Sequence, residues 1–168
     1  LGSYFYDFNK INNNINSFDE SLSVKIDSPN FSLRDYQNLS EVSQLKRLIK
    51  ISDPEKNKKT LFIWPEGIFY ESYLQNMSLY KNLFEDKFSE NHLIIFGINN
   101  FVNNVNSTNK KYFNSLIVVN NKIEILSVYN KINLVPFGEF LPFEELLSKI
   151  GLKKITPGYS SFSPGENR

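Results

Sequence analysis

Two short segments of the sequence contain residues that could carry out acid–base chemistry. In the first, Glu66 follows the apolar run Thr60 to Trp64, a pattern typical of a strand buried on both faces. Functional groups collect at the carboxyl ends of strands in α/β sheets, so this position suits a catalytic carboxylate. Partial desolvation beside Trp64 and Pro65 would make that carboxylate a better proton acceptor. A glutamate that simply begins a turn fits the local pattern equally well.

The second segment runs from Tyr129 to Pro142 and contains Lys131 and Glu139. Lys131 follows a predicted strand, where a fixed ammonium group can stabilise a developing oxyanion. Glu139 could orient the lysine, because the prolines around it make the backbone rigid. A surface lysine and a surface glutamate beside a turn would fit the same residues.

The residue types exclude several kinds of site. The chain contains no cysteine, so these residues hold no disulfide, no thiolate metal site and no nucleophilic thiol. The single histidine, His92, excludes a multi-histidine metal site. His92 opens the apolar run Leu93 to Phe96, and we interpret it as a structural residue at a strand edge. These residue types therefore predict no thiolate or multi-histidine metal site.

The composition indicates an ordinary globular domain. A chain of 168 residues is long enough for one domain with a sizeable core. The net charge is +1, and the sequence contains no basic stripe of the kind that binds nucleic acid. No nucleic-acid partner is therefore expected. No run approaches the roughly 18 apolar residues that cross a membrane. The first residue is Leu1 and the sequence stops in a loop-like stretch at Arg168, which suggests a piece of a longer protein.

Hydrophobic periodicity predicts strands separated by helices, the order of a layered α/β fold. Residues 1–20 are Asn-rich and are interpreted as a linker, and residues 99–109 as a loop. Asn120-Asn121 suits the tight turn of a hairpin, because Asn tolerates positive φ. We expect strands at 22–26, 60–64, 92–98, 112–119 and 122–129, and helices after Ser40, at 71–88 and near 143–150.

Two of the predicted helices have a recognisable apolar face. Ser40 is a plausible N-cap for the first, which is expected to end at Asp53-Pro54. Its predicted core residues are Val42, Leu45, Leu48 and Ile49. In the second helix, one stripe that we assign to the core comprises Tyr73, Met77, Tyr80, Phe84 and Phe88.

Together, the two chemical segments resemble a known family. Trp64-Pro65-Glu66 and Tyr129-Asn130-Lys131 resemble the Glu and Lys motifs of the nitrilase, or carbon–nitrogen hydrolase, superfamily. The longer run from Asn130 through Val135-Pro136-Phe137-Gly138-Glu139-Phe140 to Pro142 is similar to its apolipoprotein N-acyltransferase branch. The chain departs from the family at Arg34-Asp35-Tyr36, where many members carry a Trp.

The resemblance implies both a fold and a set of site residues. It covers roughly residues 20 to 168, and implies that residues 21–168 are the N-terminal and central part of a nitrilase-like domain. That domain would be a four-layer α-β-β-α sandwich, incomplete at the C-terminus. The family triad is Glu, Lys and Cys. Glu66 matches its Glu, Lys131 matches its Lys and Glu139 matches a further important Glu, while the Cys would lie beyond Arg168.

The resemblance also implies a reaction and a location. The whole enzyme would transfer a fatty acyl chain from phospholipid to the N-terminal amine of a lipoprotein's diacylglyceryl-cysteine, through a Cys thioester. The resemblance implies no metal and no organic cofactor. It would lie in the bacterial inner membrane, with this domain facing the periplasm and membrane association through segments outside this chain. Two alternatives remain open on the residues alone. One is a soluble nitrilase or amidase acting on a small amide, and the other is a non-catalytic remnant of a split gene.

Overall fold

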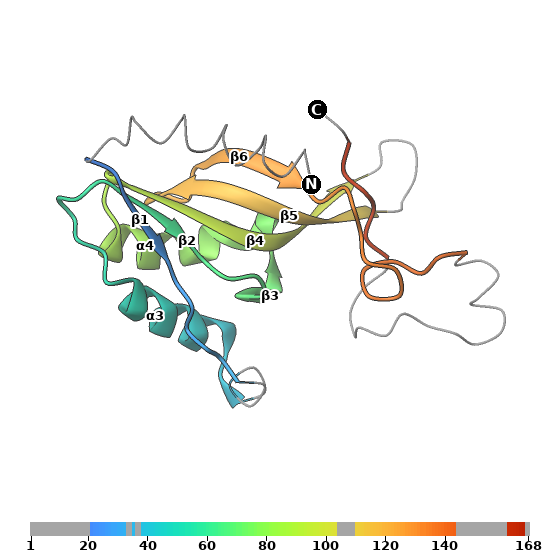
Figure 1. Cartoon of the computed structure of the whole chain (residues 1–168), viewed down its shortest axis with the longest axis horizontal. Helices are drawn as coiled ribbons and strands as arrows, with labels where there is room; N and C mark the ends of the chain where they lie inside the picture. The colour runs from blue at the N-terminus through green and yellow to red at the C-terminus, as the bar shows by residue number, and fades with distance from the viewer. Residues whose placement is uncertain (1–20, 33–34, 36–37, 104–109, 144–160, 167–168) are drawn as a thin grey trace, which may run out of the picture.

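The computed structural model describes residues 21–32, 35, 38–103, 110–143 and 161–166. The described strands form a six-stranded mixed sheet in the order β1-β2-β4-β5-β6, with β3 paired to β4 off this path (Figure 1). The predicted linker at 1–20 and most of the predicted helix near 143–150 lie outside the described residues. The strands are β1 (Ser23–Ile26), β2 (Thr60–Ile63), β3 (Phe69–Tyr73), β4 (His92–Asn103), β5 (Lys110–Asn120) and β6 (Ile125–Asn130).

The sheet is parallel in its first half and antiparallel in its second. β1, β2 and β4 are parallel neighbours, while β5 pairs antiparallel with β4 and β6 antiparallel with β5. Parallel neighbours need a crossover, and the helices α3 (Glu41–Ser52) and α4 (Lys81–Lys87) lie in these connections. The predicted α/β class is therefore confirmed.

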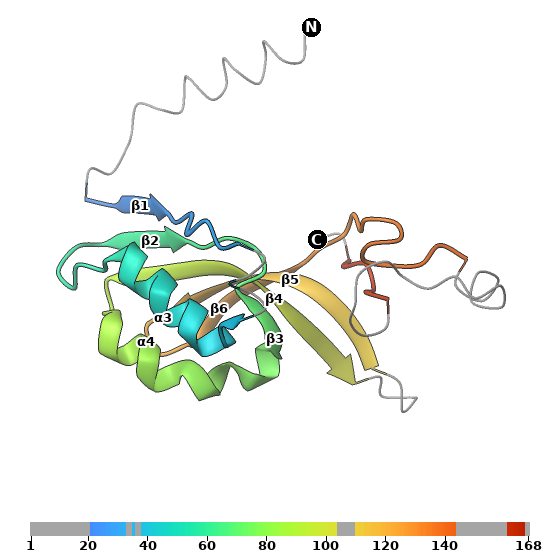
Figure 2. The same cartoon turned by 90° about the horizontal axis from the view of Figure 1, so that it is seen from below.

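Both helices lie on one face of the sheet (Figure 2). Side chains of β4 alternate, so that Ile94, Phe96 and Ile98 are buried under the helices. Leu93, on the opposite face, is 38% exposed. Apolar residues of the neighbouring strands are also exposed on that face. No described helix covers this second face, which presents Val24, Leu93, Leu116 and Tyr129.

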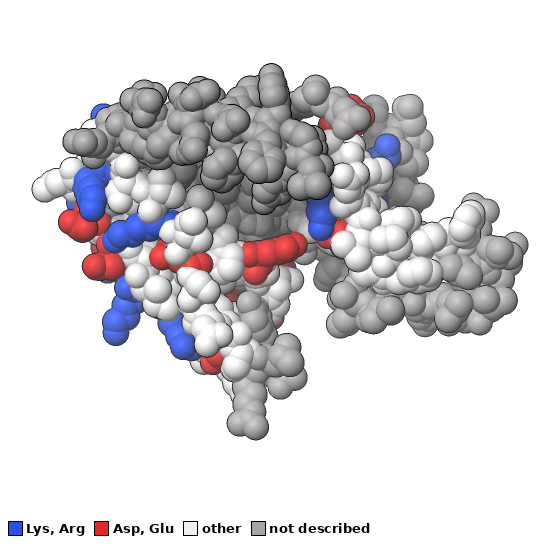
Figure 3. All heavy atoms as spheres, in the orientation of Figure 1, with Lys and Arg blue, Asp and Glu red and all other residues white. Residues whose placement is uncertain are grey.

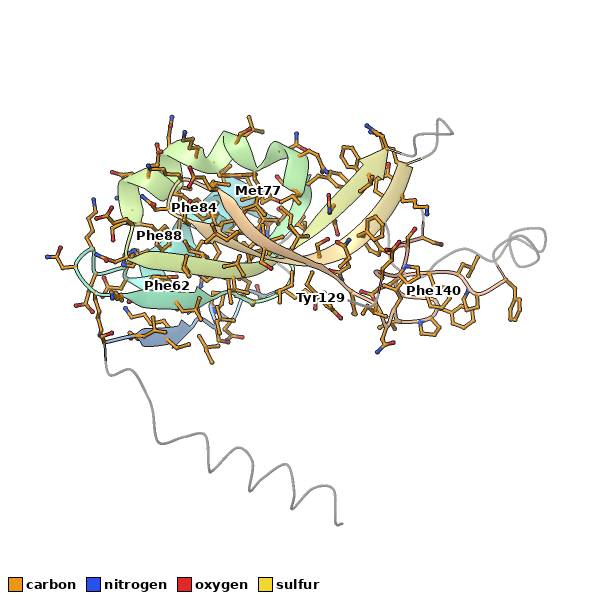
Figure 4. The ribbon with its side chains drawn as sticks, turned by 90° about the horizontal axis from the view of Figure 1, so that it is seen from above. Phe62, Met77, Phe84, Phe88, Tyr129 and Phe140 are labelled. Carbon is orange, nitrogen blue, oxygen red and sulfur yellow. The ribbon has the colours of Figure 1, made fainter. Side chains whose placement is uncertain are left out.

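Aromatic side chains dominate the core beneath the helices. Met77, Phe84 and Phe88 lie between the η2–α4 segment and the sheet, where η2 is the 3-10 helix Leu74–Tyr80 (Figure 4). Trp64 is 4% exposed and packs against Phe84, Phe88 and Phe96 at centroid distances of 5.6 to 5.9 Å. Large aromatic side chains supply much of the apolar area that a domain of this size can bury.

Helix α3 begins and ends where the sequence predicts, but its buried face differs. The Ser40 side chain accepts a hydrogen bond from the Ser43 N–H, and Asp53 closes the helix in the left-handed region at φ 42°. Leu45, Leu48 and Ile49 are buried as predicted. The prediction for Val42 is wrong, since it is 43% exposed. The buried face is rotated toward Glu41, Gln44 and Ser52, whose polar groups bond to the segments packed against the helix.

The single helix predicted at 71–88 is wrong in its first half. The chain there forms β3 and then η2, and only Lys81–Lys87 is α-helical. The backbone N–H groups of Glu71 and Ser72 donate to the carboxylate of Glu41, so they are not available for a helix. The predicted apolar stripe is nevertheless core, because Met77, Tyr80, Phe84 and Phe88 are all buried. Tyr73 is only partly buried.

The hairpins extend further than predicted. β4 continues through Asn103 instead of ending at residue 98, because residues 99–103 pair with 110–114 of β5. The prediction of a loop at 99–109 is therefore wrong for residues 99–103. The β5–β6 hairpin is confirmed, but its connection is longer than two residues. The Asn120 side-chain oxygen accepts from the N–H groups of Lys122 and Glu124, and Ile123 takes a positive φ of 60°. β6 therefore starts at Ile125.

His92 has a structural role, as predicted. It is fully buried against Phe62 and Phe88, its Nδ1 accepts a hydrogen bond from the Ser89 N–H, and its Nε2 lies 3.0 Å from the Glu55 carbonyl oxygen. With Nδ1 accepting, Nε2 carries the proton and donates it to that carbonyl. The ring thus satisfies two backbone groups at the start of β4.

The buried face of α3 predicts that two truncations on this helix change the free energy of unfolding by different amounts. Leu48→Ala removes a fully buried side chain and should lower the free energy of unfolding by about 2–5 kcal/mol. Val42→Ala, at an exposed position on the same helix, should change it by less than about 0.5 kcal/mol. Urea unfolding followed by circular dichroism measures both. Equal losses for the two variants would contradict this assignment of the buried face.

Candidate active site

Glu66 lies just beyond the carboxyl end of β2. The strand continues into Trp64, whose N–H donates to the Ile95 carbonyl at 2.9 Å and whose Nε1 donates to Ser52 Oγ at 3.0 Å. The chain then turns at Gly67, which has a φ of 83°. The Glu66 side chain extends over Gly97 of β4, where a Cβ would lie only 3.7 Å from Glu66 Cγ.

The expected desolvation of Glu66 by its neighbours is not found. Glu66 is exposed in the described structure, because the Trp64 ring turns into the core and does not cover the carboxylate. The carboxylate is oriented by a hydrogen bond instead. Its Oε1 accepts from Asn114 Nδ2 at 3.1 Å.

Lys131 follows β6 directly and reaches a carboxylate on the next loop. Its N–H donates to the Asn114 carbonyl at 2.8 Å, which continues the β5–β6 ladder to the lysine. Its Nζ lies 2.9 Å from Glu139 Oε1, with side-chain exposures of 36% and 15%. Among the described ion pairs, the partner of Lys131 is thus Glu139.

The loop that follows Lys131 folds back to hold Glu139. The Glu139 N–H donates to the Val135 carbonyl, and Glu139 Oε2 accepts from the Val135 N–H, each at 2.8 Å. Phe137 closes this turn with a φ of 62° and donates its N–H to the Phe140 carbonyl at 2.7 Å. These hydrogen bonds and the positive φ of Phe137 thus form a compact turn around one carboxylate.

Asn114 joins the two halves of the site, and sequence reasoning did not name it as a site residue. Its Nδ2 donates to Glu66 Oε1 at 3.1 Å and to Glu139 Oε1 at 2.8 Å. Both partners are acceptor-only carboxylates, so the amide nitrogen must face them. Asn114 lies on β5 opposite Asn99 of β4, and this strand register arises only in the folded sheet.

The segment Ser161–Gly165 is hydrogen-bonded to the backbone around the site. The Phe162 N–H donates to the Glu139 carbonyl at 2.8 Å, and the Gly165 N–H donates to the Lys131 carbonyl at 2.9 Å. Between them, the Ser163 N–H donates to the Tyr112 carbonyl of β5 at 2.7 Å. Gly165 approaches the chain so closely that a Cβ would lie 2.2 Å from the Asn130 carbonyl oxygen. A glycine is therefore required for this strand-like contact with Lys131.

The rim of the site is apolar. Val135, Phe137 and Phe143 are 53%, 44% and 80% exposed and lie on the loop that carries Glu139. Figure 3 shows few charged side chains on the described part of this loop. By contrast, Lys, Arg, Asp and Glu side chains are mixed over the β1–α3 region. A separate hollow of about 520 Å³ lies between the ends of β5 and β6 and residues 163–166, and its lining includes none of Glu66, Asn114, Lys131 and Glu139.

The arrangement can move protons and stabilise negative charge. Glu66 is an exposed carboxylate that could accept a proton, and Lys131 is a fixed ammonium group 2.9 Å from the carboxylate of Glu139. Within the described residues, no group of three His, Cys, Asp or Glu side chains could hold a metal ion. The sequence contains no cysteine, so a thiol nucleophile does not come from these 168 residues.

The electrostatics of Glu139 follow from its partners. Burial raises the pKa of its carboxyl, whereas the hydrogen bond from the Val135 N–H lowers it. Bonds from Lys131 and Asn114 lower the pKa further, and the net pKa lies below the ordinary value of 4.5. Glu139 is therefore ionised at neutral pH and holds Lys131 through a charge-assisted bond.

The lowered pKa of Glu139 predicts a pH-dependent stability. The ionised carboxylate stabilises the folded chain at neutral pH, and this contribution is lost as the pH falls from 4.5 through the lowered pKa. Glu139→Gln should therefore destabilise the chain at pH 7, and the gap from wild type should narrow toward pH 3. Urea unfolding across this range measures it. Glu90→Gln, at an exposed position, is the control, and a gap for Glu139→Gln that stays constant with pH would contradict the prediction.

The close contact of Gly165 predicts a second effect. Gly165→Ala should lower the midpoint of thermal unfolding and loosen the Lys131 segment, because the new methyl group meets a backbone oxygen that cannot rotate away. Gly138→Ala is the matched control, since its Cβ would meet Val135 Cγ1 at 3.4 Å. Differential scanning calorimetry compares the two variants. An unchanged midpoint for Gly165→Ala would show that this contact does not constrain the site.

Comparison with known proteins identifies relatives of this chain. No family model matches it. The apolipoprotein N-acyltransferase of Rhizobium leguminosarum bv. trifolii is 29% identical over 111 residues, which cover 66% of this chain and 21% of that protein. The apolipoprotein N-acyltransferase of Allorhizobium ampelinum is 26% identical over 123 residues, covering 73% and 23%. That of Rhodopseudomonas palustris is 45% identical over 56 residues, covering 33% and 10%.

The similarity to solved structures is weaker. The crystal structure of an N-terminal amidase with a Gln-Val peptide matches 68% of this chain and 28% of its own, with 18% identity and a TM-score of 0.36. The chain spans about a fifth of the length of the curated relatives that match most of it. Over about two thirds of its own length, it is a distant homologue of the apolipoprotein N-acyltransferases.

Proposed function

We propose that this chain is part of the catalytic domain of an apolipoprotein N-acyltransferase. Such an enzyme moves a fatty acyl chain from phospholipid to the N-terminal amine of a lipoprotein's diacylglyceryl-cysteine. The observation that carries the proposal is the network in which Asn114 joins Glu66 to Glu139 and Glu139 pairs with Lys131. The resemblance assigns Glu66, Lys131 and Glu139 to the site, and Asn114 on β5 joins the two segments that carry them.

The proposal includes the nitrilase-like fold. Residues 21–168 would form the N-terminal and central part of an α-β-β-α sandwich, with residues 1–20 as a linker. The exposed apolar face of the sheet supports this, because a second sheet packed on it would bury Val24, Leu93, Leu116 and Tyr129. Apolar side chains spread over several neighbouring strands are costly when left in water.

In the proposed mechanism, Glu66 is the general base. It takes the proton from the thiol of a cysteine outside these residues, and the thiolate attacks the carbonyl carbon of a phospholipid ester. The Lys131 ammonium stabilises the oxyanion of the tetrahedral intermediate. The ester bond breaks, the lysophospholipid leaves with a proton from Glu66, and a thioester remains.

The second half of the reaction uses the same groups. The free α-amine of the lipoprotein attacks the thioester, Glu66 receives a proton from that amine, and the thiol is regenerated. Glu139 touches neither substrate in this scheme. It holds Lys131 by the 2.9 Å ion pair and holds Asn114, which orients Glu66.

The apolar rim supports a lipid substrate over a small amide. Val135, Phe137 and Phe143 present exposed apolar surface on the loop that positions Glu139, where an acyl chain could bind. Among the described residues no helix is long and apolar enough to span a bilayer. By its similarity to the apolipoprotein N-acyltransferases, we place the enzyme in the bacterial inner membrane, with this domain facing the periplasm and attachment through segments outside this chain.

The proposal predicts losses in the longer protein that contains this chain and the nucleophile. Glu66→Ala and Lys131→Ala should each lower acyl transfer by at least about a hundredfold, since they remove the base and the oxyanion partner. A phospholipid with a labelled acyl chain reports the thioacyl adduct, and a diacylglyceryl-peptide reports the N-acylated product. The exposed residues Glu90 and Lys122, changed to Ala, are matched controls and should retain activity.

Two outcomes would overturn the proposal. Near-normal transfer by Glu66→Ala or Lys131→Ala would remove these residues from the mechanism. Hydrolysis of a small amide by the wild-type protein, without any adduct from phospholipid, would instead assign it to the amidases. The 168-residue chain alone should form no thioester, because it has no cysteine.

A further inference from the structure

Glu41 is a buried carboxylate with an unusual number of donors. It is the first residue of α3 and is 3% exposed. Its Oε2 accepts from the N–H groups of Glu71 at 2.7 Å and Ser72 at 3.1 Å. Its Oε1 accepts from Ser72 Oγ at 2.5 Å and from the Tyr80 hydroxyl. A charge so fully buried is tolerated only where hydrogen bonds replace its hydration.

The backbone that Glu41 binds has an irregular partner on its other side. β3 pairs with β4 at Phe69↔Ile98 and next at Tyr73↔Asn99, so residues 70–72 have no opposite residue on β4. Such a bulge leaves N–H groups without strand partners. The Glu41 carboxylate accepts two of them, and so holds β3 in this bulged path.

The same helix holds the chain on the other side of Glu66. At the C-terminal end of α3, Ser52 Oγ accepts from Trp64 Nε1 at 3.0 Å, and the Asp27 carboxylate lies 2.6 Å from that hydroxyl. The exposed Glu66 therefore lies on a short segment tied to α3 at both ends, by Trp64 before it and by Glu71 and Ser72 after it. Between these ties, Gly67 makes the turn and Ile68 is fully buried.

We propose that Glu41 is a positioning residue for Glu66. The carboxylate fixes the bulged backbone of β3, and the fixed backbone sets the place of Glu66 relative to Asn114. Replacing one carboxylate oxygen with an amide NH2 group leaves the buried donors on that side without an acceptor, and the segment shifts to find new partners. The inference rests on the proposed role of Glu66, but its geometric content concerns only the Glu66–Asn114 hydrogen bond.

The side-chain amide of Asn114 is a direct probe of this geometry. In the chain labelled with ¹⁵N, Glu66→Ala defines the resonance position of Asn114 Nδ2 without its Glu66 partner. Glu41→Gln should move the Asn114 resonance part of the way toward that position. Glu71→Gln is the matched control, because it removes the same charge from an exposed side chain and keeps the N–H that reaches Glu41. It should leave the resonance in place.

The ring signals of His92, in the core at the far end of β4, separate a local shift from general loosening. They should not change in Glu41→Gln. An unchanged Asn114 resonance in a folded Glu41→Gln chain, even one with a lower unfolding temperature, would show that Glu41 is structural only. So would displacement of the Asn114 and His92 signals together.

A milder variant covers the case in which Glu41→Gln does not fold. Tyr80→Phe removes one donor to the carboxylate and keeps Glu41 and both backbone bonds. It should move Asn114 in the same direction by a smaller amount, and no movement would overturn the inference. A failure of acyl transfer in the longer protein would overturn the proposed function instead, and would leave these resonances as they are.

Discussion

The site depends on one side-chain amide that serves two carboxylates. Asn114 Nδ2 donates to Glu66 and to Glu139, which otherwise belong to unconnected parts of the chain. Two carboxylates this close repel each other, and the Lys131 ammonium offsets one of the two charges. The amide can bridge them because it offers two N–H donors from one nitrogen. An aspartate at this position would add a third negative charge and no donor.

The mixed sheet brings these groups together. β4 pairs parallel with β2 on one edge and antiparallel with β5 on the other, so only β4 separates the carboxyl end of β2 from β5. The Glu66 side chain lies against Gly97 of β4 and reaches Asn114. The β5–β6 ladder then continues to Lys131, whose N–H bonds to the Asn114 carbonyl. The register of three strands thus decides which polar side chains meet.

Polar contacts also fix the segments that no strand pairing holds. The loop around Glu139 is closed by its own bonds to Val135 and by the Phe162 N–H. The segment around Glu66 is held by buried polar side chains of α3. In both places a side-chain carboxylate or hydroxyl supplies hydrogen bonds that a regular helix or strand would otherwise make. Each buried polar group of these segments needs such a partner.

The sequence by itself determined the described strands other than β3, the ends of α3 and the structural role of His92. It also singled out Glu66, Lys131 and Glu139 as the residues to examine. These depend on local patterns: apolar runs, a serine cap and two distinctive motifs. Only the tertiary structure decided the path of residues 69–80, the exposure of Val42 and Glu66, and the part played by Asn114. The N–H groups of Glu71 and Ser72 find their acceptor on Glu41, and Asn114 meets its carboxylates across strands. Contacts between residues so far apart in sequence leave no periodic signal, because they arise only when the elements pack.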